Sequence, residues 1–275
     1  MERLFDAKAK LSVTINGLLV PFSQAPYSCT RFTQPFIFYN GGSPFDVSLA
    51  GSCALVREAG ENYLIATRHQ LGKRSDERER TEVCVAFPSE ERPGTTGLVT
   101  PCGSVLVSYD QPEMQYAEDL LILMFTRGEK RPEFNLRFLD INRVSTLDEA
   151  KAGEIVSYFI TAFPSVGSKY NLTEDGMALA EVISGFARLT LEPSEANVMD
   201  GHIAFHVKEN VPKERNLDGY SGAPVFFVWL DASKNAHLGF AGIVRLGGNN
   251  ILHVYDGDRI RRIIQGSRRS ASTSR

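Results

Sequence analysis

The chain has 275 residues, of which 43% are hydrophobic and 23% charged, a composition typical of a globular protein with a sizeable core. Its formal net charge of -3 excludes the strongly basic balance of a nucleic-acid-binding protein. No stretch is apolar enough for a membrane span, and residues 11–22 are too interrupted by polar side chains for a signal peptide. We therefore expect a cytoplasmic protein that binds neither nucleic acid nor membrane.

The chain has four cysteines, Cys29, Cys53, Cys84 and Cys102. Their spacing lacks the C-x-x-C pattern of a metal or redox centre. The last three lie in apolar, strand-like segments, so we expect buried free thiols in a reducing compartment. His202 and His206 are near one another, but no third metal ligand is close to them in the sequence. The sequence therefore predicts neither a metal nor a cofactor.

Short apolar runs rich in Val, Ile, Phe and Leu, separated by Gly, Pro, Asn and Asp, dominate the chain. This pattern is typical of an antiparallel β-barrel or β-sandwich. In chain order, the predicted strands are 48–56, 63–67, 83–87, 103–109, 120–125, 155–162, 178–191, 202–207, 223–230, 238–245 and 251–255. Helical patterns are few: residues 145–149 suggest a capped turn, and residues 258–264 form an amphipathic pattern.

A charged segment without strand character divides the predicted strands into two groups. The predicted organisation is an N-terminal extension (1–45), a first β-module (about 46–126), a crossover (about 127–152), a second β-module (about 153–256), a C-terminal helix (about 257–265) and a tail (266–275). The tail is polar, and we expect it to be disordered.

The most informative stretch is Asp218-Gly219-Tyr220-Ser221-Gly222-Ala223-Pro224, which leads into the apolar run 225–229. A serine between two glycines before a strand indicates a tight turn, because glycine adopts backbone conformations that other residues avoid. Such a serine becomes a nucleophile when a histidine reaches its hydroxyl. Ser221 is therefore the candidate nucleophile.

Two other residues stand at strand ends and suit the roles of its partners. His69 follows the predicted strand 63–67, and Asp119 precedes the strongly apolar run 120–124. Taken alone, Asp119 is more simply interpreted as a solvated strand start. The chain order His69, Asp119, Ser221 indicates that the three residues belong to one site, which none of them indicates alone.

These residues and motifs resemble the chymotrypsin-like (trypsin-fold) serine peptidases, in which histidine, aspartate and serine follow in the same order. The resemblance covers residues 45–264 and includes Phe163-Pro164 and the run 242–247, Gly-Ile-Val-Arg-Leu-Gly. It implies an all-β fold of two packed antiparallel six-stranded barrels with a short C-terminal helix. The competing α/β-hydrolase fold is disfavoured, because its serine precedes a helix and its histidine comes last.

The resemblance implies a serine endopeptidase, a hydrolase that acts on a protein or peptide substrate. Ser221 would attack the scissile carbonyl, His69 would take and return the proton, and Asp119 would hold the imidazole. The backbone N–H groups of Gly219 and Ser221 would form the oxyanion hole. The alternative is a catalytically silent binding or scaffold module of the same fold.

Three residues depart from the pattern of the family. Tyr220 replaces the aspartate that pairs with a new N-terminus in the secreted members, so their zymogen switch is not expected here. This departure leaves open control by an activating protein partner. Gln70 replaces the cysteine that follows the catalytic histidine. Arg245 stands where a serine usually contacts the aspartate, and a side chain that points outward is the simpler expectation.

The substrate pocket is predicted only through the register of this resemblance. Arg215 falls at the base of the pocket, and Arg245, Gly247 and His253 fall along its walls. Together, the cationic residues would favour an acidic side chain at the cleavage site, because opposite charges pair in a desolvated pocket. The simpler interpretation of Arg215 is a residue of a solvated loop.

Overall fold

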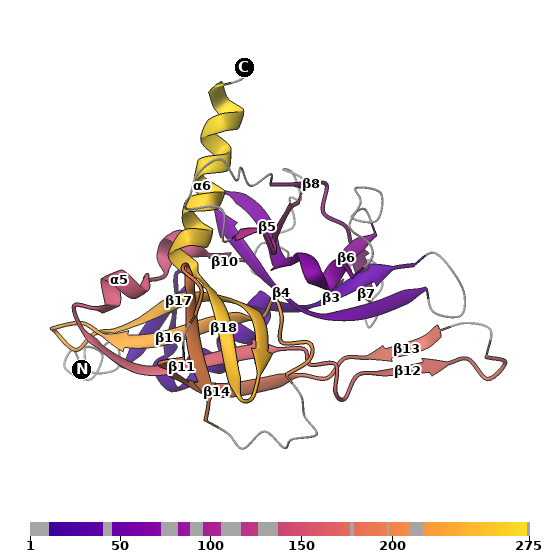
Figure 1. Ribbon diagram of the computed structural model, residues 1–275, viewed down its shortest axis with the longest axis horizontal. Coiled ribbons are helices and arrows are strands. Elements are labelled where there is room, and N and C mark those ends of the chain that lie inside the picture. Colours follow the sequence, from indigo (N-terminus) through magenta and orange to yellow (C-terminus); the bar gives the residue numbers. More distant parts are fainter. Residues whose placement is uncertain are drawn as a thin grey trace.

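The computed structural model describes residues 11–40, 46–72, 82–88, 96–105, 117–125, 137–176, 179–196, 198–208 and 217–273. Most of these residues belong to β-strands, which form two packed modules followed by a C-terminal helix (Figure 1). None of the helices in the described ranges combines the length and the apolar character needed to cross a membrane.

The first module is a curled sheet with the strand order β7-β6-β3-β4-β5-β9-β8. Its strands are β3 (Thr33–Tyr39), β4 (Val47–Glu58), β5 (Glu61–Thr67), β6 (Val83–Pro88), β7 (Thr96–Val99), β8 (Gly103–Ser104) and β9 (Leu120–Met124), and β10 (Leu139–Asp140) pairs with β4. Within the described residues, the terminal strands β7 and β8 are short and do not pair with each other. The closed first barrel predicted from the sequence is therefore not shown.

The second module is a closed barrel with the strand order β11-β14-β15-β18-β17-β16. Its strands are β11 (Glu154–Ala162), β14 (Ala187–Pro193), β15 (His202–Val207), β16 (Pro224–Leu230), β17 (Ala236–Gly248) and β18 (Ile251–Asp256). Every pair of neighbouring strands is antiparallel. The prediction of a six-stranded antiparallel barrel is confirmed for this module.

Strand β16 shows how the two modules pack against each other. Successive side chains of a strand point to opposite faces. Phe227 accordingly lies in the barrel interior, whereas its neighbour Phe226 lies in a core shared with first-module residues such as Val56 and Ile65. Both phenylalanines are fully buried. This two-sided burial explains why β16 reads as a continuous apolar run in the sequence.

The N-terminal segment contributes to the first module. A hairpin of β1 (Ser12–Ile15) and β2 (Leu18–Pro21) leads through two 3₁₀ turns, η1 (Phe22–Gln24) and η2 (Cys29–Phe32), and the short helix α2 (Ala25–Ser28) into β3. Strand β3 therefore lies within the stretch that the sequence analysis assigned to an extension ending at residue 45. The assignment missed it because Gln34 and Pro35 are atypical of a strand, although both are buried in the fold.

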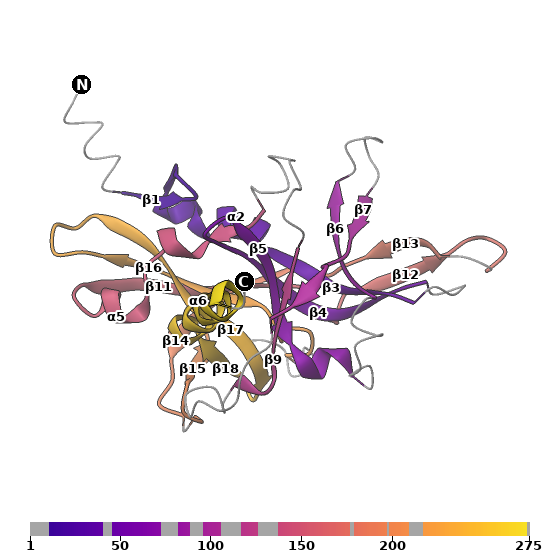
Figure 2. The ribbon, with the colours of Figure 1, turned by 90° about the horizontal axis from the view of Figure 1, so that it is seen from above.

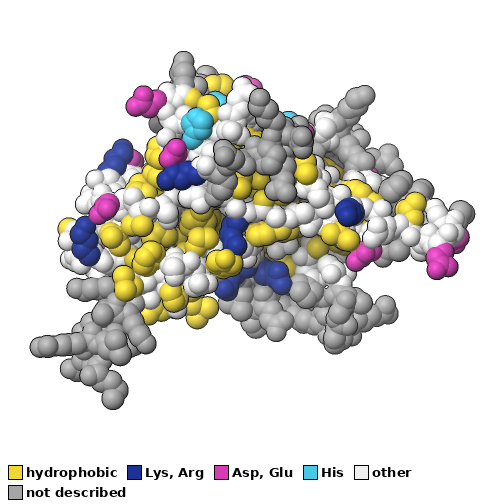
Figure 3. Space-filling model, turned by 90° about the horizontal axis from the view of Figure 1, so that it is seen from below, with side chains coloured by type: hydrophobic (Ala, Val, Ile, Leu, Met, Phe, Trp, Pro, Cys, Tyr) yellow, Lys and Arg dark blue, Asp and Glu magenta, His cyan; other side chains and the backbone are white. Residues whose placement is uncertain are grey.

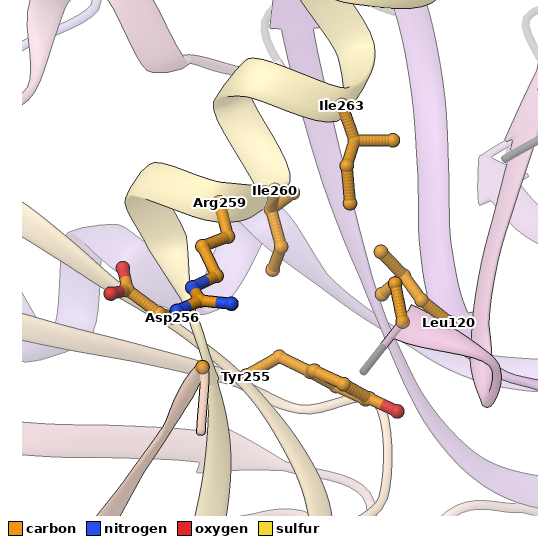
Figure 4. Close-up of a pocket in the computed structure, with 8 residues that line it drawn as sticks. Leu120, Tyr255, Asp256, Arg259, Ile260 and Ile263 are labelled. Atoms are coloured by element: carbon orange, nitrogen blue, oxygen red, sulfur yellow. The ribbon is translucent and has the colours of Figure 1, made fainter. Parts of the chain in front are cut away.

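The helix α6 (Gly257–Thr273) follows β18 and projects from the body of the molecule (Figure 1). It continues beyond residue 265, so the predicted disordered tail is wrong for residues 266–273. Its first turns are held by apolar contacts: Ile260 and Ile263 point toward Leu120 around a small pocket that Tyr255 and Arg259 also line (Figure 4). The helix therefore supports the start of β9, directly after Asp119.

Two smaller features complete the fold. The capped turn expected near residue 147 is the short helix α5 (Leu147–Ala150), which follows the 3₁₀ turn η5 (Ile141–Arg143). An arm of two strands, β12 (Lys169–Leu172) and β13 (Leu179–Ile183), extends from the second barrel in both views (Figures 1 and 2). The predicted single strand 178–191 is thus two strands, β13 and β14.

Several large apolar side chains reach the surface, and Figure 3 shows such side chains together with Lys and Arg side chains on one face. On the arm, Tyr170 is one of them, and its hydroxyl accepts a hydrogen bond from Leu49 N at 2.9 Å, which links the arm to β4.

The cysteines are free thiols. Cys102 is exposed, contrary to the expectation, because it precedes the edge strand β8.

Candidate active site

The structure brings His69, Asp119 and Ser221 together between the two modules. His69 Nδ1 lies 2.7 Å from Asp119 Oδ2, and His69 Nε2 lies 2.9 Å from Ser221 Oγ. Because a carboxylate accepts hydrogen bonds, Nδ1 carries the proton and Nε2 is left to accept the Ser221 hydroxyl. The imidazole side chain is 47% exposed and the carboxylate 18%, so solvent and ligands can reach the histidine.

His69 lies in the 3₁₀ turn η3 (Arg68–Leu71), immediately after β5. Thr67 caps the turn together with Gln70. Two backbone contacts join this turn to the start of β9: Arg68 N donates to Asp119 O at 2.6 Å, and His69 N donates to Asp119 Oδ1 at 2.8 Å. The carboxylate is therefore held by both the backbone and the side chain of His69, which fixes the orientation of the ring.

The electrostatics favour an ionised Asp119. Burial alone would raise the pKa of the Asp119 carboxyl. The hydrogen bonds from the His69 side chain and backbone outweigh burial, and together with the nearby Arg245 guanidinium they hold the pKa below its ordinary value. Asp119 is therefore a carboxylate at neutral pH.

The turn that carries Ser221 needs both of its glycines. Gly219 and Gly222 have φ values of +86° and +79°, a conformation that side chains other than glycine rarely adopt. A Cβ atom on Gly219 would lie 2.5 Å from Ser165 N, and one on Gly222 would lie 2.1 Å from Ser52 O. The glycines thus allow the turn to pack backbone against backbone.

The N–H groups of Gly219 and Ser221 are the predicted oxyanion donors. Asp218 O accepts from Ser165 N at 3.1 Å, and Tyr220 O accepts from Ala223 N at 2.9 Å. In a trans peptide the N–H points opposite to the carbonyl, so these two bonds also fix the directions of the Gly219 and Ser221 N–H groups. Neither N–H donates to an acceptor among the described residues.

Ser52 on β4 is fully buried and connects the turn to the first module. Its N–H donates to Ser221 O at 3.2 Å, and its hydroxyl donates to Gly219 O at 2.8 Å. The same hydroxyl accepts from Phe163 N at 2.8 Å. The hydroxyl and the backbone N–H of one small residue therefore fix the carbonyls on both sides of Tyr220.

Gln70, which stands where the resembled family has a cysteine, also links separate segments. Its Oε1 accepts from Thr67 N and from Thr67 Oγ1, both at 2.9 Å. Its Nε2 donates to Ala50 O at 2.8 Å and to Ser52 O at 2.9 Å. The buried amide joins the histidine turn to β4 without a covalent bond.

Arg245 does not point outward. Its Nε lies 3.7 Å from Asp119 Oδ2, and its Nη1 donates to Met199 Sδ at 3.0 Å. The guanidinium carbon lies 5.9 Å from the centre of the Tyr255 ring. The Arg245 carbonyl oxygen is 3.1 Å from Ser221 Oγ and is a second acceptor for that hydroxyl. Arg245 therefore contacts the acid and the serine, instead of lining a separate pocket.

The remaining pocket candidates are less defined. Arg215 lies outside the described residues. Gly247 is exposed, and a Cβ atom there would meet the Leu252 and Leu217 side chains at 2.8 and 2.9 Å. His253 is half-buried on β18 and pairs with Leu246 and with Ala204 in the sheet. A pocket for an acidic side chain stays a prediction that now depends on Arg215 and His253, because Arg245 lies beside Asp119.

Tyr220 is buried in the barrel interior, where it packs in the same core as Leu217, Ala223 and Val244. The residue before the serine therefore anchors the turn through apolar contacts.

In the described part of the chain, no group of three or more His, Cys, Asp or Glu side chains is arranged to hold a metal ion.

Sequence reasoning missed Ser52 entirely and noted Gln70 only as a departure from the family. Their partners are backbone carbonyls of distant segments, which leave no signature in residue spacing. The only available signal was a small polar residue within the apolar run 48–56.

The comparisons with known proteins do not assign this arrangement to a family. No model of a protein family matches the chain, and the search of curated proteins found no match. The functional interpretation therefore rests on the geometry of the site and on the resemblance of its motifs.

Proposed function

We propose that this chain is a serine endopeptidase that resembles the chymotrypsin-like peptidases and cleaves peptide bonds through an acyl-enzyme. The observation that carries the proposal is the continuous contact from Asp119 through His69 to Ser221, with distances of 2.7 and 2.9 Å. These distances lie in the range that proton transfer between a base and its nucleophile requires.

In the proposed reaction, His69 Nε2 takes the proton of Ser221 Oγ as the oxygen attacks the scissile carbonyl carbon. His69 then gives that proton to the leaving amine, and the acyl-enzyme remains on Ser221. A water molecule, deprotonated by His69, releases the acid and regenerates the serine. Asp119 holds the imidazole in the required tautomer and stabilises the imidazolium that forms in each step.

The backbone of the turn supports the stabilisation of the tetrahedral intermediate. The Gly219 and Ser221 N–H groups have no acceptor among the described residues, and their directions are fixed by the carbonyl bonds of Asp218 and Tyr220. Preorganised N–H donors of this kind are each worth about 3 kcal/mol of barrier in acyl transfer. Their lack of partners favours an enzyme over a silent binding module.

The architecture supports the same proposal. His69 and Asp119 lie on the first module and Ser221 on the second, so the site forms where the two modules meet. The closed second barrel and the curled first sheet are consistent with a two-barrel peptidase fold. We propose that the first sheet also closes into a barrel.

Covalent labelling with a fluorophosphonate probe tests the proposal, because the probe reacts only with an activated serine. Wild-type protein should be labelled at Ser221, identified by mass spectrometry, and the Ser221→Ala and His69→Ala variants should not be labelled. Ser233→Ala, a change at an exposed hairpin serine, is the matched control and should label as the wild type does. Absence of Ser221-dependent labelling in folded protein would favour the silent binding module.

A further inference from the structure

Arg245 shares one carboxylate oxygen with His69. Asp119 Oδ2 lies 2.7 Å from His69 Nδ1 and 3.7 Å from Arg245 Nε. The Arg245 side chain is 25% exposed and the Asp119 side chain 18%, so solvent screens this pair only in part. Apart from His69, Arg245 is the one cation among the described residues that forms an ion pair with Asp119.

The position of the guanidinium is set by its surroundings on the second module. Met199 Sδ accepts from Nη1, and the Tyr255 ring lies beneath the guanidinium. The backbone of Arg245 belongs to β17, and its carbonyl lies within hydrogen-bond distance of Ser221 Oγ. The side chain is therefore a fixed positive charge beside the same carboxylate oxygen that the imidazole contacts.

A fixed cation at this place opposes a second cation on the same carboxylate. Protonation of His69 creates an imidazolium that Asp119 would stabilise. Arg245 already neutralises part of the Asp119 charge and repels the new positive charge. The free-base form of the imidazole, which the proposed reaction needs to accept the serine proton, is favoured as a result.

We propose that Arg245 is a positioning residue that extends the working range of the triad toward acidic pH by sharing the Asp119 carboxylate with His69. The catalytic meaning of this inference rests on the proposed function, whereas the charge coupling does not. Without the guanidinium, a larger fraction of His69 is protonated at mildly acidic pH, and that fraction cannot serve as a base.

Other ionisable groups surround this cluster. Arg68 lies beside the acid, where its Nε donates to Leu120 O, and Glu118 is exposed. On the second module, burial lowers the pKa of His202, and the nearby Arg245 and His253 lower it further. His202 is therefore neutral near pH 7 and adds no competing charge there.

The experiment measures the titration of His69 directly by NMR of the imidazole, in wild type and in Arg245→Gln, both in a Ser221→Ala background. The midpoint should move to higher pH by roughly 0.5–1 pH unit when the guanidinium is removed, as expected for one charge at this separation. Arg245→Lys retains the charge and should keep the midpoint closer to wild type. This readout requires no catalysis, so it succeeds or fails independently of the proposed function.

In a protein with an intact Ser221, the acidic limb of the fluorophosphonate labelling rate should move in the same direction and by the same amount. Arg259→Gln is the control, since Arg259 pairs with Asp200 and not with Asp119. Arg245→Met replaces the glutamine variant if that variant does not fold, because it keeps apolar contact with Tyr255. An unchanged His69 midpoint in a folded neutral variant overturns the inference.

Discussion

Ser52 Oγ donates a 2.8 Å hydrogen bond to Gly219 O and so ties the first module to the turn that carries the proposed nucleophile. Ser52 has no exposed surface, and its hydroxyl also accepts from Phe163 N. A buried group that loses its partner retains the full cost of desolvation, which makes such a bond far more important than its net energy suggests.

Replacing Ser52 by alanine should therefore impair both stability and activity. Gly219 O and Phe163 N would lose their partner, which costs about 1–3 kcal/mol of unfolding free energy. The labelling rate at Ser221 should fall by about tenfold or more, since a shift of the Gly219–Tyr220 peptide displaces the adjacent Gly219 and Ser221 N–H groups, the proposed oxyanion donors. Denaturant unfolding and labelling kinetics measure the two effects. Ser48→Ala, on the same strand, is the control, and an equal loss in both variants would contradict the proposed role.

The amide of Gln70 offers a sharper test, because glutamate has the same shape. In Gln70→Glu, a carboxylate oxygen would replace Nε2 and face the carbonyl oxygens of Ala50 and Ser52. We expect the unfolding free energy to fall by about 1–3 kcal/mol at pH 7. The loss should diminish toward pH 5, since a protonated carboxyl can donate to one carbonyl. Thermal melts across this range measure the effect, and a pH-independent loss would argue against the hydrogen-bond assignment.

The contact between Gly222 and β4 can be separated from the effect of its positive φ. A Cβ atom on Gly222 would lie 2.1 Å from Ser52 O, whereas one on Gly60, with φ of +88°, has no heavy atom within 4 Å. Gly60→Ala should cost about 1–2 kcal/mol from backbone strain alone. Gly222→Ala should cost more and should abolish labelling, because the turn must move away from β4. Equal costs in the two variants would show that close packing has no effect.

Asp119 should make stability depend on pH on the acidic side. Its carboxyl has a folded-state pKa below the ordinary value, so its contribution to stability is present above the ordinary value and is lost as pH falls through the lowered one. The difference in unfolding free energy between wild type and Asp119→Asn should be constant above about pH 5 and shrink below it. Chemical denaturation at several pH values checks this.

The same Asp119→Asn variant should lose activity at all pH values above that range. In serine triads an asparagine at this place stabilises the wrong imidazole tautomer and lowers kcat by about 10⁴-fold. The labelling rate, compared with that of Ser221→Ala as the background, is the measurement. Retention of more than about a tenth of the wild-type rate would remove Asp119 from the proposed mechanism.

The sequence pattern predicted the second module better than the first, for physical reasons. Strand β16 is buried on both faces and is therefore apolar throughout, whereas β3 contains Thr33 and Gln34, which are buried by long-range contacts. The Thr33 hydroxyl contacts the Thr161 hydroxyl of the second module. The sequence pattern does not show that such a polar residue is buried, because its hydrogen-bond partner lies in a distant segment of the chain.

The contact among His69, Asp119 and Ser221 could be anticipated because the sequence combines a glycine-flanked serine with a histidine and an aspartate at strand ends, in the chain order of a known family. The orientation of Arg245 was not, since the register of a resemblance gives the position of a side chain and not its direction. Strand β12 of the arm was also missed, because the alternation in Lys169-Tyr170-Asn171-Leu172 spans only four residues and all four side chains are exposed.

The bonds from Ser52 have a consequence for control of the site. The serine turn belongs to one module, whereas its histidine, its acid and the strand that pins its carbonyls belong to the other. A slight hinge opening between the modules would separate Ser221 from His69 and break the bonds from Ser52 to the turn in a single movement. A ligand that separates the modules would therefore lower the proposed activity, and one that holds them together would raise it, without contact with a reacting atom.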